Sequence, residues 1–195
     1  AYLRGQILYR AAEMLEGSAD QMMKALQWHK VGKSASRRAV EESIDRLVYF
    51  AGWTDKFQQL SSSVNPVANP HFVFTVPEPT GVVVQVHAAG DLPSLVGGMA
   101  SVLCGANVCI SVVGEHLAIA ASILGEIWHT SDLPAGAMAI LTGDAAALGV
   151  AAASHRAVDG LWVQGIAGET ERAIQIAAAD TVKRLHLQQA DTGDS

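Results

Sequence analysis

The sequence predicts an α/β protein in which a helical N-terminal layer precedes a parallel β-sheet. Apolar residues recur at helical spacing over the first third of the chain, and short β-rich runs alternate with helical segments from residue 72 onward. Such alternation implies parallel strands joined by right-handed crossovers, and hence a Rossmann-like open sheet. Half of the 195 residues are hydrophobic, enough for one sizeable core.

Three helices are expected in the N-terminal layer. The first carries an apolar face over residues 3–15. Ser18 followed by Gln21 has the form of a capping box, so a second helix should begin there. After a polar, basic break over residues 30–38, a third apolar stripe starts at Val40 and ends near Gly52. Residues 61–70 are rich in Ser, Asn and Pro and predict a connector.

The remainder predicts strands and helices in turn, after a β-rich stretch at residues 72–76. Strands are expected at residues 81–86, 108–113, 137–141, 158–163 and 183–187, and helices at residues 92–103, 116–128, 144–152 and 169–179. The chain therefore divides into an N-terminal helical layer (1–60), the connector (61–70), a Rossmann-like α/β domain (71–187) and a polar tail (188–195).

Composition excludes several classes of function. The net charge is -6 and no basic stripe is present, which argues against nucleic-acid binding and against an anionic membrane surface. No histidine pair has the spacing of a helical metal site. Cys104 and Cys109 cannot form a disulfide framework, so a reducing compartment, the cytoplasm, is expected. Because the chain opens on Ala1 within a helical pattern, we expect it to lie inside a larger protein.

Two groups of residues have a functional and a structural interpretation. The turn from Gly165 to Gly168 could cradle a phosphate at a helix N-terminus, but Glu169 and Glu171 would repel one, which favours a plain strand-to-helix turn. The aromatic residues near element ends fit core packing or an interface equally well; they are Phe50, Trp53, Trp128 and Trp162. The two cysteines are expected to be small buried hydrophobes rather than reactive thiols.

A series of short motifs, in order, resembles the aldehyde dehydrogenase superfamily. The matching segments are residues 4–15 (RGQILYRAAEML), 49–56 (YFAGWTDK), 77–83 (PEPTGVV), 103–107 (LCGAN), 133–136 (LPAG), 141–144 (LTGD) and 155–161 (HRAVDGL). Together they cover nearly the whole chain. The resemblance implies a truncated form of that family's nucleotide-binding fold.

The sequence departs from the family at the positions that the resemblance would make catalytic. Residues 88–90 (AAG) stand where the family has the Pro-Trp-Asn that supports its oxyanion hole, and Gly90 has no side-chain amide to donate. Gln188 stands at the family's general-base glutamate, and a neutral amide cannot take a proton from water. The resemblance therefore implies no catalytic residue in this chain.

The positions that would bind the cofactor are also altered. Val112 replaces the lysine that reaches the adenine-side ribose, although Glu115 of the same motif is present. In the glycine turn, Gly165 is kept, but Thr170 stands at the second glycine, with Gly168 nearby. The candidate cofactor positions, all degenerate, are Val112, Glu115, Gly143, Gly165 and Gly168.

These losses resemble the degenerate C-terminal unit of the two-unit, family-sixteen aldehyde dehydrogenases. That resemblance implies a non-catalytic domain with a structural or oligomerisation role, whose partner is a catalytic unit in the same polypeptide or another subunit, and which is expected to form homo-oligomers. No cofactor is then expected in this segment. Two alternatives remain: part of the cofactor domain of an active NAD-dependent aldehyde dehydrogenase, or a sensor that keeps a nucleotide pocket without chemistry.

Overall fold

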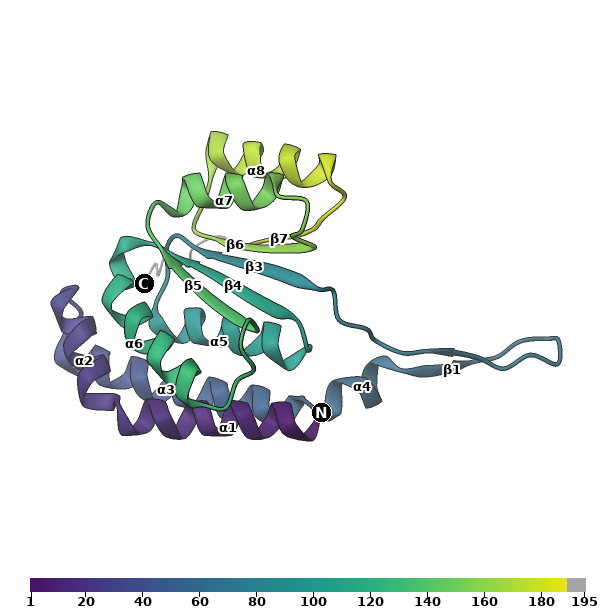
Figure 1. Ribbon diagram of the computed structural model, residues 1–195, viewed down its shortest axis with the longest axis horizontal. Helices are drawn as coiled ribbons and strands as arrows, with labels where there is room; N and C mark the ends of the chain where they lie inside the picture. The colour runs from purple at the N-terminus through teal and green to yellow at the C-terminus, as the bar shows by residue number, and fades with distance from the viewer. Residues whose placement is uncertain (189–195) are drawn as a thin grey trace.

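The computed structural model describes residues 1–188 and has a parallel sheet with helices on both faces (Figure 1), which confirms the predicted fold class. The five strands lie in the order β5-β4-β3-β6-β7, and all neighbours are parallel. Their bounds are β3 Val82–His87, β4 Val108–Val113, β5 Met138–Thr142, β6 Gly160–Gln164 and β7 Arg184–Gln188. Each of the five predicted strands is therefore present, and its observed ends lie within two residues of the predicted ends.

One face of the sheet carries most of the helices. These are α1 (Tyr2–Gly17), α2 (Ala19–Trp28), α3 (Lys33–Trp53), α5 (Leu92–Cys104), the 3-10 helix η1 (Glu115–Leu117) and α6 (Ala118–Thr130). Helices α5 and α6 lie against the sheet, and α1 and α3 lie outside them (Figure 1). One buried cluster runs from Leu8 and Leu47 through Met99 to Cys109 of β4, so the helical layer and the sheet share a core. Trp128 of α6 is 3% exposed and belongs to this core.

The other face is covered by α7 (Ala145–Ser154) and α8 (Gly168–Asp180) (Figure 1). Its core is a second cluster that includes Val84, Val86, Leu161, Val163 and Ile174. Alanines and Gly149 dominate α7, which lets that helix lie close to β3: a Cβ on Gly149 would be 3.4 Å from Val86 Cγ1. Among residues 1–188, no helix has both the length and the apolar character needed to cross a bilayer.

A two-stranded arm projects from the body (Figure 1). It follows the short helix α4 (Lys56–Ser61) and consists of β1 (Ser63–Asn65) paired antiparallel with β2 (Val73–Thr75). The predicted connector at 61–70 thus contributes one strand and the tip of a hairpin. We call residues 63–76 the apolar arm, because valine and phenylalanine side chains along it are exposed.

Two local predictions in the helical layer are right in position but wrong in detail: α2 does begin after Ser18 and a break does precede α3, but the capping box is absent and the break is shorter than expected. Ser18 makes no side-chain capping bond; its backbone N–H donates to Met14 O and Leu15 O, so α1 passes almost directly into α2 without a free helix end to cap. The polar stretch expected as a break over residues 30–38 is already helical from Lys33. Its charged side chains lie on the solvent side of α3, and Ser36 is buried.

Candidate functional site

The carboxyl ends of the strands meet at one edge of the sheet, where open α/β sheets bind ligands. From β3 the chain continues to β4 and β5 on one side, and it later returns to β6 and β7 on the other side. The strand order therefore reverses between β3 and β6. At this switch point the last residues of the two strands, His87 and Gln164, are register partners.

The loops that leave β3 and β6 touch each other at the switch point. The Ala88 N–H donates to Gln164 O at 3.0 Å. Gly165 has a φ of 76°, and a Cβ added there would lie 2.5 Å from Ala89 Cβ and 2.7 Å from Ala89 N. Only glycine fits such a backbone conformation at such a distance. The loops that follow β3 and β6 are therefore in close backbone contact at the switch point.

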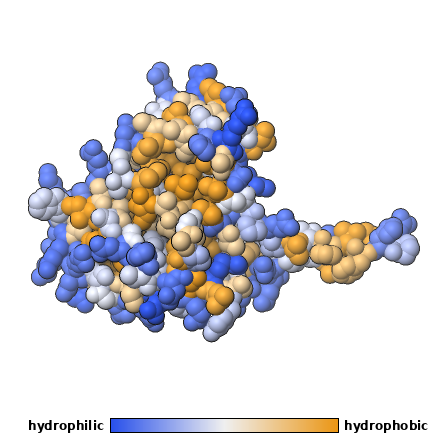
Figure 2. All heavy atoms as spheres, viewed as in Figure 1, coloured by the Kyte–Doolittle hydropathy of each residue, from blue (hydrophilic) through white to orange (hydrophobic). Residues whose placement is uncertain are grey.

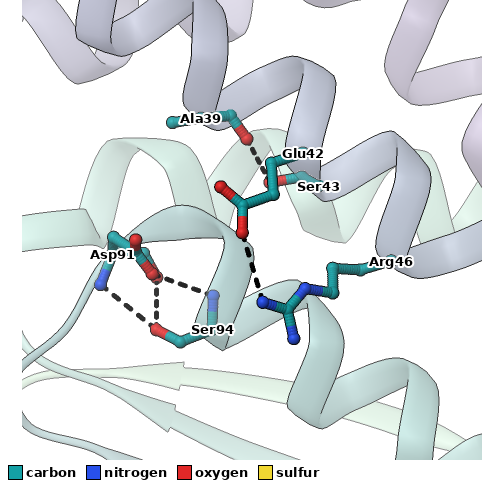
Figure 3. Close-up of polar contacts among 6 residues, drawn as sticks. All are labelled: Ala39, Glu42, Ser43, Arg46, Asp91 and Ser94. Atoms are coloured by element: carbon teal, nitrogen blue, oxygen red, sulfur yellow. Dashed lines mark hydrogen bonds and ion pairs between the residues drawn. The ribbon is translucent and has the colours of Figure 1, made fainter. Parts of the chain in front are cut away.

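The helix that follows β3 begins with a complete capping box (Figure 3). The Ser94 N–H donates to Asp91 Oδ1 at 3.0 Å, and the Asp91 N–H donates to Ser94 Oγ at 3.2 Å. The carboxylate of Asp91 thus occupies the amino end of α5, which an anionic ligand would otherwise use. Beside it, the exposed pair Glu42–Arg46 lies on α3, with 3.2 Å between Arg46 Nη2 and Glu42 Oε1.

The glycine turn before α8 has an open but acidic end. Gly168 has a φ of 69°, and a Cβ there would have no atom within 4 Å. Ala167 at the N-cap supplies no side-chain acceptor, so the first amides of α8 have no capping side chain. Glu169 and Glu171 occupy the first turn, as expected, and their charge opposes a phosphate.

The other three candidate cofactor positions differ in burial and in whether they offer a polar side chain. Val112 is 1% exposed and belongs to the apolar cluster under α7, so its side chain faces the core. Glu115 is exposed at the start of η1. Gly143 follows β5 with a φ of 154°, and its N–H donates to Val113 O at 3.2 Å. All three lie at the carboxyl edge of the sheet, but only the glutamate presents a polar side chain there.

Gln188, at the general-base position implied by the resemblance, ends β7. Its Oε1 accepts a hydrogen bond from Trp162 Nε1 at 3.2 Å, and its backbone oxygen accepts one from the Gly165 N–H at 3.2 Å. The amide therefore ties β7 to β6. Residues 189–195, which include the rest of the expected tail, lie outside the described residues.

Sequence reasoning missed the cluster that His87 forms at the end of β3. Its ring lies 5.7 Å from the ring of His116, centroid to centroid, with 22° between the planes. His87 is fully buried, and neither of its ring nitrogens has a hydrogen-bond partner; Gln164 Oε1 and His116 Nε2 are also buried without one. Burial, and next the neighbouring His116, lower the pKa of His87 to about 4. The signal in the sequence was a polar residue ending an apolar strand.

The remaining nucleophiles and metal ligands give no second site. Cys104 and Cys109 are free and buried, as predicted, and burial raises the pKa of the Cys109 thiol to about 12. Within residues 1–188, no three side chains among His, Cys, Asp and Glu are grouped so that they could hold a metal ion.

Comparison with known proteins gives the family. The model of the aldehyde dehydrogenase family matches residues 1–190. Retinal dehydrogenase 2 of Gallus gallus is 30% identical over 190 residues, which is 95% of this chain and 36% of that protein. The mitochondrial benzaldehyde dehydrogenase of Antirrhinum majus is 26% identical over 193 residues, which is 96% of this chain and 35% of that protein.

Solved structures agree in fold. PnpE in complex with nicotinamide adenine dinucleotide superposes with a TM-score of 0.87 and 22% identity, over 96% of this chain and 38% of PnpE. The NAD+ complex of aldehyde dehydrogenase from Bacillus cereus gives a TM-score of 0.85 and 18% identity over the same shares. The chain spans little more than a third of the length of these relatives. From residue 1 to residue 190, it belongs to the aldehyde dehydrogenase family.

Proposed function

We propose that this chain is a non-catalytic aldehyde dehydrogenase unit that serves assembly rather than oxidation. In this proposal it corresponds to the degenerate unit of a family-sixteen enzyme and works in a reducing compartment such as the cytoplasm. Its partners are a catalytic unit, in the same polypeptide or in another subunit, and further copies of itself. The observation that supports the proposal is the close contact of Ala89 with Gly165 at the switch point, which in this proposal leaves no room for a dinucleotide.

The charges around the switch point support the same conclusion. Asp91 and Glu169 place carboxylates at the two helix ends that could attract a pyrophosphate. Val112 is buried and offers no cation to a ribose. Gly90 carries no amide for a developing oxyanion, and Gln188 has no carboxylate to deprotonate water. The side chains that the resemblance would assign to the oxyanion, to the general base and to the ribose contact are therefore replaced in this segment.

The assembly role is supported by the apolar arm. Phe72 and Phe74 are 73% and 58% exposed, and their rings lie 5.5 Å apart. Figure 2 shows hydrophobic residues along the arm up to its hydrophilic tip. A lone two-stranded hairpin is marginally stable in water, and an exposed apolar surface of this kind marks an interface. We therefore assign to the arm the contact with another subunit.

The alternative is that the segment contributes to the cofactor domain of an active NAD-dependent enzyme. One observation favours it. The uncapped amides at Gly168 and the exposed Glu115 lie at the carboxyl edge of the sheet, and two structural relatives with this fold were solved with NAD bound. Thermal unfolding with NAD and NADP separates the two functions. A ligand at 100 times its Kd stabilises a protein by about 2.7 kcal/mol, a shift of several degrees. We expect no shift with millimolar cofactor; a saturable rise would overturn the proposal that this segment binds no nucleotide.

The arm is tested by sedimentation equilibrium. We expect the wild-type chain to associate and the double variant Phe72→Ser, Phe74→Ser to sediment as a monomer with unchanged circular dichroism. Trp28→Ser is the matched control, because Trp28 is 78% exposed but lies on α2, outside the arm. Equal association of the wild type and the arm variant, or a monomeric wild type, would remove the assembly role from this surface.

A further inference from the structure

The stacked pair His87–His116 extends to a third imidazole. His29 caps the carboxyl end of α2, and its Nε2 is buried without a hydrogen-bond partner, as is Nε2 of His116. His29 is also close enough to His116 to oppose its protonation electrostatically. The imidazoles of His116 in η1 and His87 at the end of β3 are stacked, and His29 at the end of α2 acts on His116 electrostatically. We call His29, His116 and His87 the histidine seam.

The seam joins structural layers that are distant in sequence. Helix α2 belongs to the N-terminal layer, η1 leads from β4 into α6, and β3 is the central strand of the sheet. A buried polar group without a partner costs stability even when it is neutral, and a buried charge costs much more. The seam therefore tolerates neutral imidazoles. The side chain of Gln164 and the backbone of Asp91 favour a protonated His87, and the backbone of Gly90 favours a protonated His116, but burial of the rings outweighs them.

Few charges lie near enough to compensate protonation. Asp91, at the N-cap of α5, is the carboxylate that favours a charged His87, but it already accepts from the Ser94 N–H. From β6 the facing group is the neutral amide of Gln164. Lys30 and Glu115 flank the seam in sequence and are exposed. When one imidazole is protonated, its nearest titratable neighbour is another imidazole and not a free carboxylate.

We propose that the histidine seam is an acid-sensitive joint, which holds α2 and η1 against the sheet at neutral pH and releases them when the stacked rings of His87 and His116 become protonated. This inference is independent of the proposed function. It concerns the packing of the helical layer, and it holds whether or not a nucleotide binds.

The direction of the pH effect follows from linkage. The pKa of His87 falls from the ordinary 6.5 to about 4 in the folded chain, because of burial first and His116 second. Burial, and His29, also lower the pKa of His116. Lowered folded pKa values give stability that is fully present above pH 6.5 and is lost as the pH falls toward 4. For His87 alone, the unfolding equilibrium constant should rise roughly 30-fold between pH 7.5 and pH 5.

Urea unfolding at pH 7.5 and pH 5 of the full 195-residue chain measures the global effect. We expect the wild type to show the rise of roughly 30-fold or more, and His87→Leu to lose most of it. His116→Gln provides a second variant in case the leucine perturbs the core. His129→Gln is the control, because His129 is exposed on the neighbouring helix α6 and should keep the wild-type dependence. Equal pH dependence in all four proteins would overturn the proposal.

Hydrogen exchange distinguishes a joint from general acid unfolding. At pH 5, after correction for intrinsic rates, we expect the protection of α2 and η1 amides to fall at least about tenfold more than that of α7 and α8. In His87→Leu the two regions should respond alike. A uniform loss of protection over both regions in the wild type would show that no separate joint exists.

Discussion

Two groups of buried polar residues share one face of strand β3, the first with β4 and the second with β6, and they differ in hydrogen bonding. In the middle of the sheet, Ser111 Oγ donates to Gln85 Oε1 at 3.3 Å, and Gln85 Nε2 donates to Leu95 O at 3.3 Å. Two residues further along β3, His87 lies beside Gln164 with neither ring nitrogen bonded. The first group is part of the structure at any ordinary pH; the second depends on its protonation.

The difference lies in how the polar side chains of the two places are satisfied. In the middle of the sheet, Gln85 bonds to Ser111 on β4 and to the Leu95 carbonyl on α5, and so links the helix to the strands. The side-chain oxygen and nitrogen of Gln85 both have a partner. At the carboxyl edge the loops after β3 and β6 are in close contact instead, and polar atoms of His87, His116 and Gln164 are buried without hydrogen-bond partners. In each place a glycine allows the close approach: Gly98 over Gln85, and Gly165 against Ala89.

The largest effect is expected at the carboxyl edge. Gly165→Ala combines a positive φ with a Cβ 2.5 Å from Ala89, where backbone atoms must move. We expect a loss of about 3 kcal/mol in the free energy of unfolding, measured with urea. Gly168→Ala is the control, because it has a similar φ of 69° but open space, and should cost about 1 kcal/mol. Equal costs would mean that the loops do not touch.

A smaller effect is expected in the middle of the sheet. In Gly98→Ala the new Cβ would lie 2.6 Å from Gln85 Cδ, but a side chain can shift more easily than a loop. We expect a loss of about 2 kcal/mol, and less than half of that loss in a Gln85→Ala background, where the obstacle is gone. Additive costs in this double-mutant cycle would show that the glycine is not there for Gln85.

The smallest effects contrast the two polar groups directly. At pH 7.5, Gln85→Leu leaves Ser111 buried without its acceptor and should cost about 1 to 2 kcal/mol. His87→Leu removes atoms that have no partner, so it should change stability by less than about 0.5 kcal/mol. Chemical denaturation measures both. A larger cost for His87→Leu than for Gln85→Leu would reverse the assignment of which group is satisfied.

Periodicity predicted the sheet because each strand is a short apolar run between turn residues. Strand β4, for instance, has the predicted bounds Val108–Val113. Periodicity did not predict the elements that form only through contacts with distant parts of the chain. Strand β1 is three residues within a Ser- and Pro-rich stretch, and it exists only through pairing with β2. Ser18 has the sequence of a cap, but α1 leads almost directly into α2 there.

The candidate site was predicted in part for a similar reason. Positive φ angles at Gly143, Gly165 and Gly168 are local properties, and the glycines themselves signal them. The contact of Gly165 with Ala89 and the stack of His87 on His116 join residues far apart in the chain. They depend on strand register, which no local pattern encodes.

The central claim is that the switch-point crevice is closed to a dinucleotide, and crystals grown with millimolar NAD test it most directly. We predict electron density without nucleotide over the loop at Gly165, and Ala89 still in contact with it. An NAD molecule ordered across that loop, with the residue 88–90 segment displaced, would contradict the account.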